Sequence, residues 1–236
     1  AAQFAGWGID YLKYDNCYRP VSQGSEIMYR RMGHALRSTG RDIFFAACQW
    51  GTENVGDWIR STGAHSYRST TDIRDTWESV KEIAEVRFSR LYEGAQCCHN
   101  DMDMLVCGMN GHSHNPEVAN TGCTQAEYRT HFALWAMLGS PLIIGCDLRK
   151  ADAFTKDLLQ NKDLISINQD PEARTCFRIG CISSPGTFSL VKPLGSGDYA
   201  VGLFNFAEKE MRASISFWDM GVSSAAGQKL SFYDRF

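Results

Sequence analysis

Two charged side chains lie close together on a predicted strand near the start of the chain, the ammonium of Lys13 and the carboxylate of Asp15. Because side chains alternate along a strand, Tyr11, Lys13 and Asp15 share one face, while Leu12 and Tyr14 point to the other. We expect this charged pair to be buried among aromatic residues. Such burial is costly unless the pair is used or tightly hydrogen-bonded. The pattern therefore predicts a strand that ends at a catalytic site.

Polar residues also follow the other predicted strands, namely Gln49 and Trp50, Arg68 and Asp72, Asp101 and Asp103, and Asp147. In a βα barrel, the ends of the strands lie on one face, where groups from different strands converge. That geometry would bring Asp15 and Asp72 close together. Two carboxylates across a cleft, one ionised and one protonated, are suited to cleaving a glycoside.

The elements that must position these residues are predicted from periodicity and turn residues. The expected strands are 9–15, 42–49, 64–68, 103–106 and 142–145. The expected helices are 25–39, 54–61, 75–91, 124–138 and 151–161. Ser25 is the expected cap of the first of these helices, and Asp75 that of the third. Strands that alternate with helices indicate parallel βα units.

After Pro171 the sequence pattern changes to alternating strands separated by Gly and Ser. These strands are expected at 187–193, 199–206 and 211–217. We therefore expect a catalytic domain over 1–171 and an antiparallel β domain over 172–236. Five parallel strands are too few for a complete (β/α)8 barrel, which takes about 250 residues. A dinucleotide-binding sheet would need a Gly-rich turn of the G-x-G-x-x-G type, which the sequence lacks. The predicted fold is α/β, a (β/α)8 TIM barrel without its first three βα units, followed by a partial antiparallel β-sandwich.

Composition disfavours several classes of partner. The net charge of −3 provides no basic stripe for nucleic acid and no polybasic anchor, and no apolar run approaches the roughly 18 residues of a membrane span. The nine cysteines are irregularly spaced in a chain too large to need a disulfide framework, which predicts mostly reduced thiols. The Cys and His residues between 97 and 123 also lack the regular spacing of a zinc site. We expect no metal and no cofactor.

Six motifs occur in order along the chain and together resemble glycoside hydrolase family 27, whose typical members are the retaining α-galactosidases, or melibiases. They are Y-L-K-Y-D-N-C at 11–17, C-Q-W-G at 48–51, R-S-T-T-D-I-R-D-T-W at 68–77, N-D-M-D-M-L-V at 100–106, the run at 127–145, and N-K-D-L-I-S-I-N-Q-D-P at 161–171. The resemblance begins at what would be the fourth barrel strand. It therefore implies a fragment truncated at its N-terminal side.

The resemblance also implies roles for individual residues. Asp15 matches the family's nucleophile, which attacks the anomeric carbon, and Asp72 matches its general acid/base. Lys13 and Arg68 match residues that hydrogen-bond sugar hydroxyls, and the positions that match the lining of the sugar pocket are Cys48, Gln49, Trp50, Asp103 and Met104. The charge of Lys13 favours the ionised nucleophile.

The sequence departs from the family pattern at several positions. His99 stands where many members carry Trp, and Met102 replaces a common Pro. Ala64 occupies the position of the cysteine that is bonded to Cys48 in eukaryotic members, which favours a bacterial-type intracellular enzyme over a secreted one. The family's first three βα units supply part of the sugar pocket. We therefore expect the 236-residue chain alone to show little activity and to aggregate.

The expected substrate is an α-galactoside oligosaccharide, and the expected assembly is a homo-oligomer of the full-length protein. The bulk of Gln49, with Thr52, favours galactose over N-acetylgalactosamine, and such a pocket also fits β-L-arabinopyranosides. Alternatives are an α-N-acetylgalactosaminidase or another family member, a catalytically inactive sugar-binding fragment, and a Schiff-base lyase that uses Lys13. Structural roles also stay open, for Arg68 as an ion-pair partner and for Asp101 as a support of Arg68 or of a turn.

Overall fold

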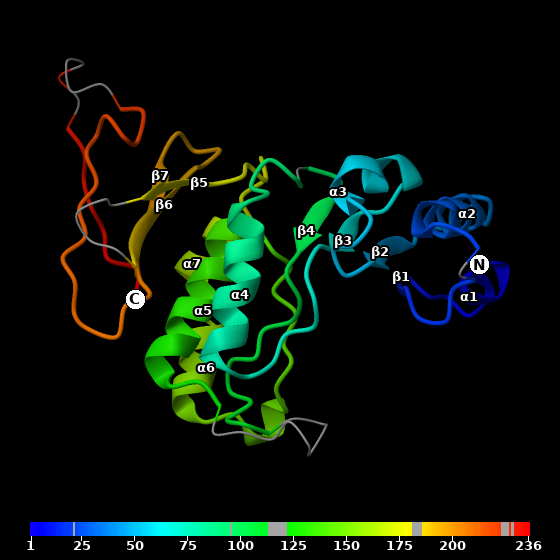
Figure 1. Cartoon of the computed structure of the whole chain (residues 1–236), viewed down its shortest axis with the longest axis horizontal. Helices are drawn as coiled ribbons and strands as arrows, with labels where there is room; N and C mark the ends of the chain where they lie inside the picture. The colour runs from blue at the N-terminus through cyan, green and yellow to red at the C-terminus, as the bar shows by residue number, and fades with distance from the viewer. Residues whose placement is uncertain (21, 95, 113–121, 181–185, 223–226, 228) are drawn as a thin grey trace.

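Four short parallel strands form the first sheet, in the spatial order β1 (Tyr11–Asp15), β2 (Phe44–Cys48), β3 (Ser66–Arg68) and β4 (His99–Asp101). The computed structural model describes the whole chain except residues 21, 95, 113–121, 181–185, 223–226 and 228. The segments that join successive strands contain helices, as parallel pairing requires (Figure 1). The expected parallel βα units are therefore present.

Helices cover the sheet along one face. They are α1 (Ala2–Gly6), α2 (Ser25–Arg37), α3 (Val55–Trp58) and the 3-10 turn η1 (Ile59–Thr62). Tyr29 of α2 and Ile59 of η1 pack with Phe45 and Tyr67 of the strands in one apolar cluster. Gly33 allows this close approach, because a Cβ there would lie 2.0 Å from the carbonyl oxygen of Thr62.

A second helical layer follows the sheet. It contains α4 (Trp77–Phe88), α5 (Gln125–Leu138), the 3-10 turn η3 (Leu148–Lys150), α6 (Ala153–Leu159) and α7 (Lys162–Asn168). Helix α5 is the centre of the larger core, and residues from Ala133 to Leu138 are all buried. Its start is fixed by a capping box, in which Thr124 accepts from the Glu127 N–H and the Glu127 side chain accepts from the Thr124 N–H.

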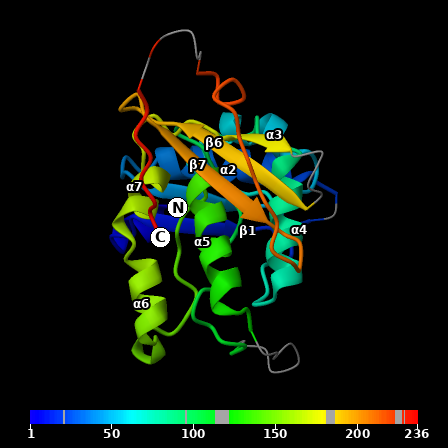
Figure 2. The ribbon, with the colours of Figure 1, turned by 90° about the vertical axis from the view of Figure 1, so that its left-hand side faces the viewer.

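The C-terminal strands β5 (Phe177–Gly180), β6 (Thr187–Pro193) and β7 (Tyr199–Asn205) form an antiparallel sheet in that order. The sheet packs beside α4 and α5 (Figure 2). Phe88 of α4 meets Phe188 of β6 edge to face with ring centroids 5.0 Å apart. The expected α/β class, with an antiparallel sheet after the parallel one, is confirmed.

Several predicted elements are placed differently by the structure. The strand expected at 103–106 lies at His99–Asp101, and Leu105 forms only an isolated bridge with Ile144, where a further strand was expected. Residues 211–217 form no strand within the described part of the chain. Helix α7 and strand β5 were not predicted.

Two predicted helix caps are also wrong. Ser25 is the first residue of α2, and Gly24 occupies the cap position. Thr76, not Asp75, caps α4 by accepting from the Ser79 N–H. Asp75 is buried and accepts instead from the Tyr128 hydroxyl and from backbone N–H groups of Gly111 and Cys123.

Candidate functional site

The register of the parallel sheet brings most of the predicted polar residues to one face. Asp15 pairs with Cys48, and Arg68 pairs with Asp101. Ala46, two residues before Cys48, pairs with Ser66, two residues before Arg68. Because paired residues of parallel strands share a face, these side chains belong to one surface. We call it the polar face, and its members are Tyr11, Lys13, Asp15, Cys48, Arg68 and Asp101.

The charged pair of β1 is exposed rather than buried, which corrects the sequence expectation. Lys13 and Asp15 are exposed, and the helices cover the opposite face, to which Leu12 and Tyr14 contribute. Strand β1 is also an edge of the sheet. Tyr11, at the other end of this row, stacks on Phe44 with ring centroids 5.3 Å apart.

Arg68 is buried and forms ion pairs with two carboxylates of the site. Its side chain is 3% exposed, with Nη1 2.9 Å from Asp103 Oδ1 and Nη2 2.8 Å from Asp72 Oδ1. Nη2 also donates to the carbonyl oxygen of Thr70 at 3.1 Å, while Nε is buried without a hydrogen-bond partner among the described atoms. Burial lowers the pKa of Arg68, but the charge of Asp103 and the hydrogen bond to Asp72 outweigh it and raise the pKa.

The two predicted catalytic carboxylates share a neighbour, the thiol of Cys17. Desolvation raises the pKa of this thiol, and the charges of Asp15 and Asp72 raise it further. Both carboxylates therefore lie within electrostatic range of the same sulfur atom. The Asp72 side chain is 82% exposed, and its ion pair with Arg68 holds it beside the polar face.

Asp101 and Asp103 both hold the backbone around the site. Asp101 Oδ1 accepts from the Asp103 N–H at 2.8 Å, so Asp101 supports a turn, which was one of its two expected structural roles. Burial raises the pKa of Asp101, against the backbone hydrogen bond and the charge of Arg68. Asp103 has a φ of +86° and accepts from the N–H groups of Ile73 and Met104 at 2.8 Å each. Asp103 thereby ties the loop after β3 to the loop after β4.

Cys48 belongs to the polar face, and Trp50 lies in the turn that follows its strand. Burial raises the pKa of the Cys48 thiol to about 11, although the charges of Lys13 and Arg68 and a hydrogen bond from Trp50 lower it. These interactions place the ammonium, the guanidinium and the indole around one sulfur atom. Trp50 is partly exposed and has a φ of +71°, so it lies in a turn that leaves the strand sharply.

Gln49 points to the face of the sheet that the helices cover, and not to the polar face. Its side chain is fully buried, and Nε2 donates to Ser25 Oγ at 3.1 Å and to Thr52 Oγ1 at 2.7 Å. The reason is strand alternation, because Cys48 points to the polar face and the next residue points to the helices. Gln49 therefore anchors the first turn of α2, and its bulk gives no argument about the substrate.

Met104 is partly buried against the larger core. A Cβ at Gly145 would lie 2.6 Å from its sulfur atom, so the glycine makes room for the Met104 side chain.

Tyr11 was placed on the polar face by alternation but given no role. Burial raises the pKa of its phenol, as do the charges of Asp101 and Cys48, which shows that it lies within range of both.

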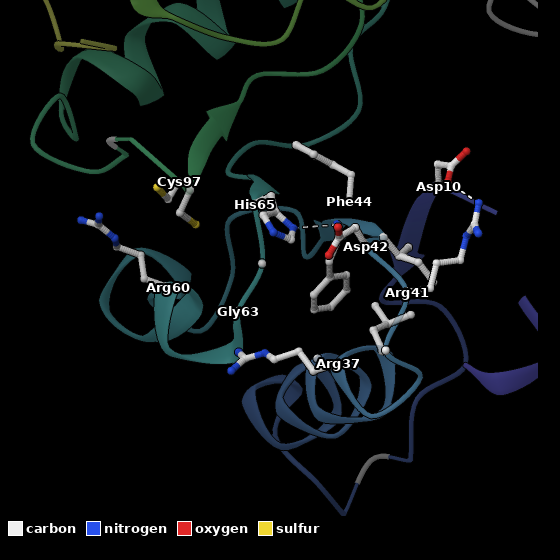
Figure 3. Close-up of a pocket in the computed structure, with 16 residues that line it drawn as sticks. Asp10, Arg37, Arg41, Asp42, Phe44, Arg60, Gly63, His65 and Cys97 are labelled. Atoms are coloured by element: carbon white, nitrogen blue, oxygen red, sulfur yellow. Dashed lines mark hydrogen bonds and ion pairs between the residues drawn. The ribbon is translucent and has the colours of Figure 1, made fainter. Parts of the chain in front are cut away.

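A large cavity of about 910 Å³ lies at the other end of the strands (Figure 3). Arg41 in its wall pairs with Asp10 at 2.6 Å, and His65 Nδ1 accepts from the Phe45 N–H at 2.9 Å. These residues stand at or just before the amino ends of β1, β2 and β3. Catalytic groups of βα barrels gather at the carboxyl ends, so this cavity is separate from the candidate site.

Among the described residues, no group of three His, Cys, Asp or Glu side chains is arranged to hold a metal ion, and no helix is long and apolar enough to cross a membrane. Eight of the nine cysteines are described, and these are free thiols. Part of the Cys and His cluster considered from the sequence, including His114, lies outside the described residues.

The sequence matches the family model Melibiase_2, described as alpha galactosidase A, over residues 1–170. The chain belongs to this α-galactosidase family. One relative, α-galactosidase 2 of Arabidopsis thaliana, is 44% identical over 225 residues, which cover 95% of the chain and 50% of that protein. The chain spans about half the length of the relatives that it matches.

Solved structures of α-galactosidases agree with the family assignment. α-Galactosidase I from Mortierella vinacea is 31% identical, has a TM-score of 0.76, and is matched over 86% of this chain and 54% of its own. The α-galactosidase from Saccharomyces cerevisiae, solved with raffinose, is 27% identical with a TM-score of 0.71, over 86% of this chain and 50% of that one. The family predicted from the six motifs is therefore confirmed.

Proposed function

We propose that this chain carries the catalytic groups of a retaining α-galactosidase, which removes terminal α-linked galactose through a glycosyl-aspartate intermediate. The observation that supports this proposal most is the family match over residues 1–170, which includes every residue of the polar face. In this proposal, residues 1–171 supply strands four to eight of a (β/α)8 barrel and residues 172–236 part of a β-sandwich.

The proposed reaction has two displacements at the anomeric carbon. A carboxylate oxygen of Asp15 forms a bond to this carbon while the bond to the leaving oxygen breaks, and Asp72 gives its proton to that oxygen. In the second step Asp72 takes a proton from water, the water oxygen bonds to the anomeric carbon, and Asp15 leaves. Two inversions give net retention.

The surrounding residues suit the handling of a polar sugar. Lys13 is an exposed cation on the same face as the proposed nucleophile Asp15. Trp50 presents a partly exposed aromatic surface beside Cys48, which fits stacking on a sugar ring. Galactose is proposed as the sugar from the names of the relatives and from the raffinose bound to the yeast enzyme.

A mechanism-based inhibitor tests the nucleophile. An activated 2-deoxy-2-fluoro galactoside should label the protein once, and mass spectrometry of the digest should place the label on Asp15. Asp15→Ala should lose turnover and labelling, while Asp10→Asn, just before the amino end of β1, should keep both. A label on another carboxylate, or an active Asp15→Ala variant, would contradict the assignment.

The acid/base is tested by azide. Asp72→Ala should cleave only galactosides with good leaving groups, and azide should restore its rate and give α-galactosyl azide, the product with retained configuration. A β-azide product, or no response to azide, argues against Asp72. Because the chain spans half of its relatives, both tests belong on the longest protein that contains this sequence. Galactose binding without turnover in that protein would favour the inactive sugar-binding alternative.

A further inference from the structure

A small pocket of about 20 Å³ lies where helix α4, the start of β4, the end of α7 and strand β6 meet. Its described lining includes two buried basic side chains, Arg87 and Lys192, and a third, Arg174, which is half-exposed and pairs with Glu172. No Asp or Glu is among these lining residues. Two buried cations that face one pocket without an anion are unusual, because an uncompensated charge in the interior is costly.

Lys192 contributes a fully buried ammonium group. It is 0% exposed, and Nζ donates to the carbonyl oxygen of Ile167 at 2.6 Å. An ammonium has three N–H donors, and this bond uses one of them. Burial lowers the pKa of Lys192, while the neighbouring Cys176 and the carboxylate of Asp170 act to raise it, and the Asp170 oxygens accept from the backbone N–H groups of Glu172 and Gly195. Within the described chain, Lys192 forms no ion pair.

Arg87 contributes a buried guanidinium from the other side. It is 2% exposed, and Nη1 donates to the carbonyl oxygen of Arg90, but Nε has no hydrogen-bond partner among the described atoms. Glu93 acts on Arg87 only through space, since one of its oxygens accepts from the Tyr67 hydroxyl and the other lies 3.9 Å from Arg90. Arg87 therefore also lacks a direct carboxylate partner in the described structure.

We propose that this pocket binds a single chloride ion, held by Lys192 and Arg87. Its volume is close to that of one water molecule, which favours a monatomic anion over phosphate or sulfate, because a cavity needs roughly 10–15 Å³ to hold one water. Of the species this small, a halide compensates the buried positive charge, whereas water supplies only a dipole. The ion would join α4 to β6, and so would fix the C-terminal sheet on the helical layer.

Halide dependence of stability tests the proposal. The melting temperature of the intact chain is measured as chloride replaces fluoride or sulfate at constant ionic strength, so that screening is unchanged. At ten times the dissociation constant, chloride should raise it by about 3–6 °C. The Lys192→Met variant should lose this dependence, and the Lys162→Met variant, changed at an exposed lysine, should keep it. Equal melting curves in chloride and fluoride for the unmodified chain would overturn the proposal.

Bromide locates the ion directly and does not depend on the stability of a variant. Crystals soaked in bromide should show an anomalous peak between Lys192 Nζ and Arg87 Nε. Density for water without an anomalous peak would mean that Lys192 is neutral in the folded protein and that no halide is bound.

Discussion

The two ion pairs of Arg68 predict very different costs for two substitutions. Arg68→Met removes a guanidinium that is 3% exposed and leaves the carboxylate of Asp103, 11% exposed, without its cation. Removing one partner of a buried pair costs about 3–5 kcal/mol. Asp72→Asn removes only the other pair, whose carboxylate is 82% exposed, and exposed pairs contribute little because water and salt screen them. We therefore expect Arg68→Met to lower the free energy of unfolding far more than Asp72→Asn does.

Urea denaturation followed by tryptophan fluorescence measures both costs. Arg149→Met is the matched control, because it removes an Arg–Asp pair in which the Arg149 side chain is 89% exposed, and it should leave the midpoint unchanged. In a double-mutant cycle, Arg68→Met and Asp103→Asn should be strongly coupled, since each alone leaves the other group buried and unpaired. Similar small costs for Arg68→Met and Asp72→Asn would refute the reasoning.

Three further substitutions follow from local geometry. Thr124→Ala removes the capping box of α5 and should lower the free energy of unfolding by about 1 kcal/mol in urea denaturation. Gly33→Ala places a methyl group 2.0 Å from the carbonyl oxygen of Thr62 and should lower the melting temperature, whereas Gly6→Ala, with no atom within 4 Å, should not. His131 is fully buried, which lowers its pKa from 6.5 to about 3, so the unfolded chain binds a proton that the folded chain does not. Stability should therefore fall below pH 6.5, by up to roughly 1.4 kcal/mol per pH unit, and His131→Gln should flatten this slope in urea titrations at pH 4 to 7.

Periodicity predicted the long helices well because their buried residues recur at helical spacing over many consecutive residues. It failed for β4, whose residues His99, Asn100 and Asp101 are all polar. The apolar run that follows was taken for the strand, yet Leu105 and Val106 pack as a loop into the larger core. A strand with polar residues on both faces gives no alternation signal, and its pairing is decided by tertiary contacts.

In the candidate site, too, local sequence patterns predict some residue positions and tertiary contacts decide the others. Asp15, Cys48 and Arg68 could be assigned to one face, because alternation and parallel pairing fix it. Gln49 points away from that face, because a shift of one residue along a strand reverses the face to which a side chain points. Asp72 and Asp103 lie in loops, whose geometry no local sequence pattern predicts. The positive φ of Asp103 and its long-range hydrogen bond from Ile73 help to decide that geometry.

The arrangement of Arg68 sets a condition on the proposed mechanism. In the proposed mechanism Asp72 begins the reaction with a proton, and in the structure its Oδ1 lies 2.8 Å from Arg68 Nη2. Asp103 keeps Arg68 in place, because its own carboxylate is fixed by the N–H groups of Ile73 and Met104. Under the proposed mechanism, the exposed Asp72 is therefore the partner of Arg68 that would move when a sugar enters. A sugar hydroxyl that takes its place on Arg68 would couple substrate binding to that movement.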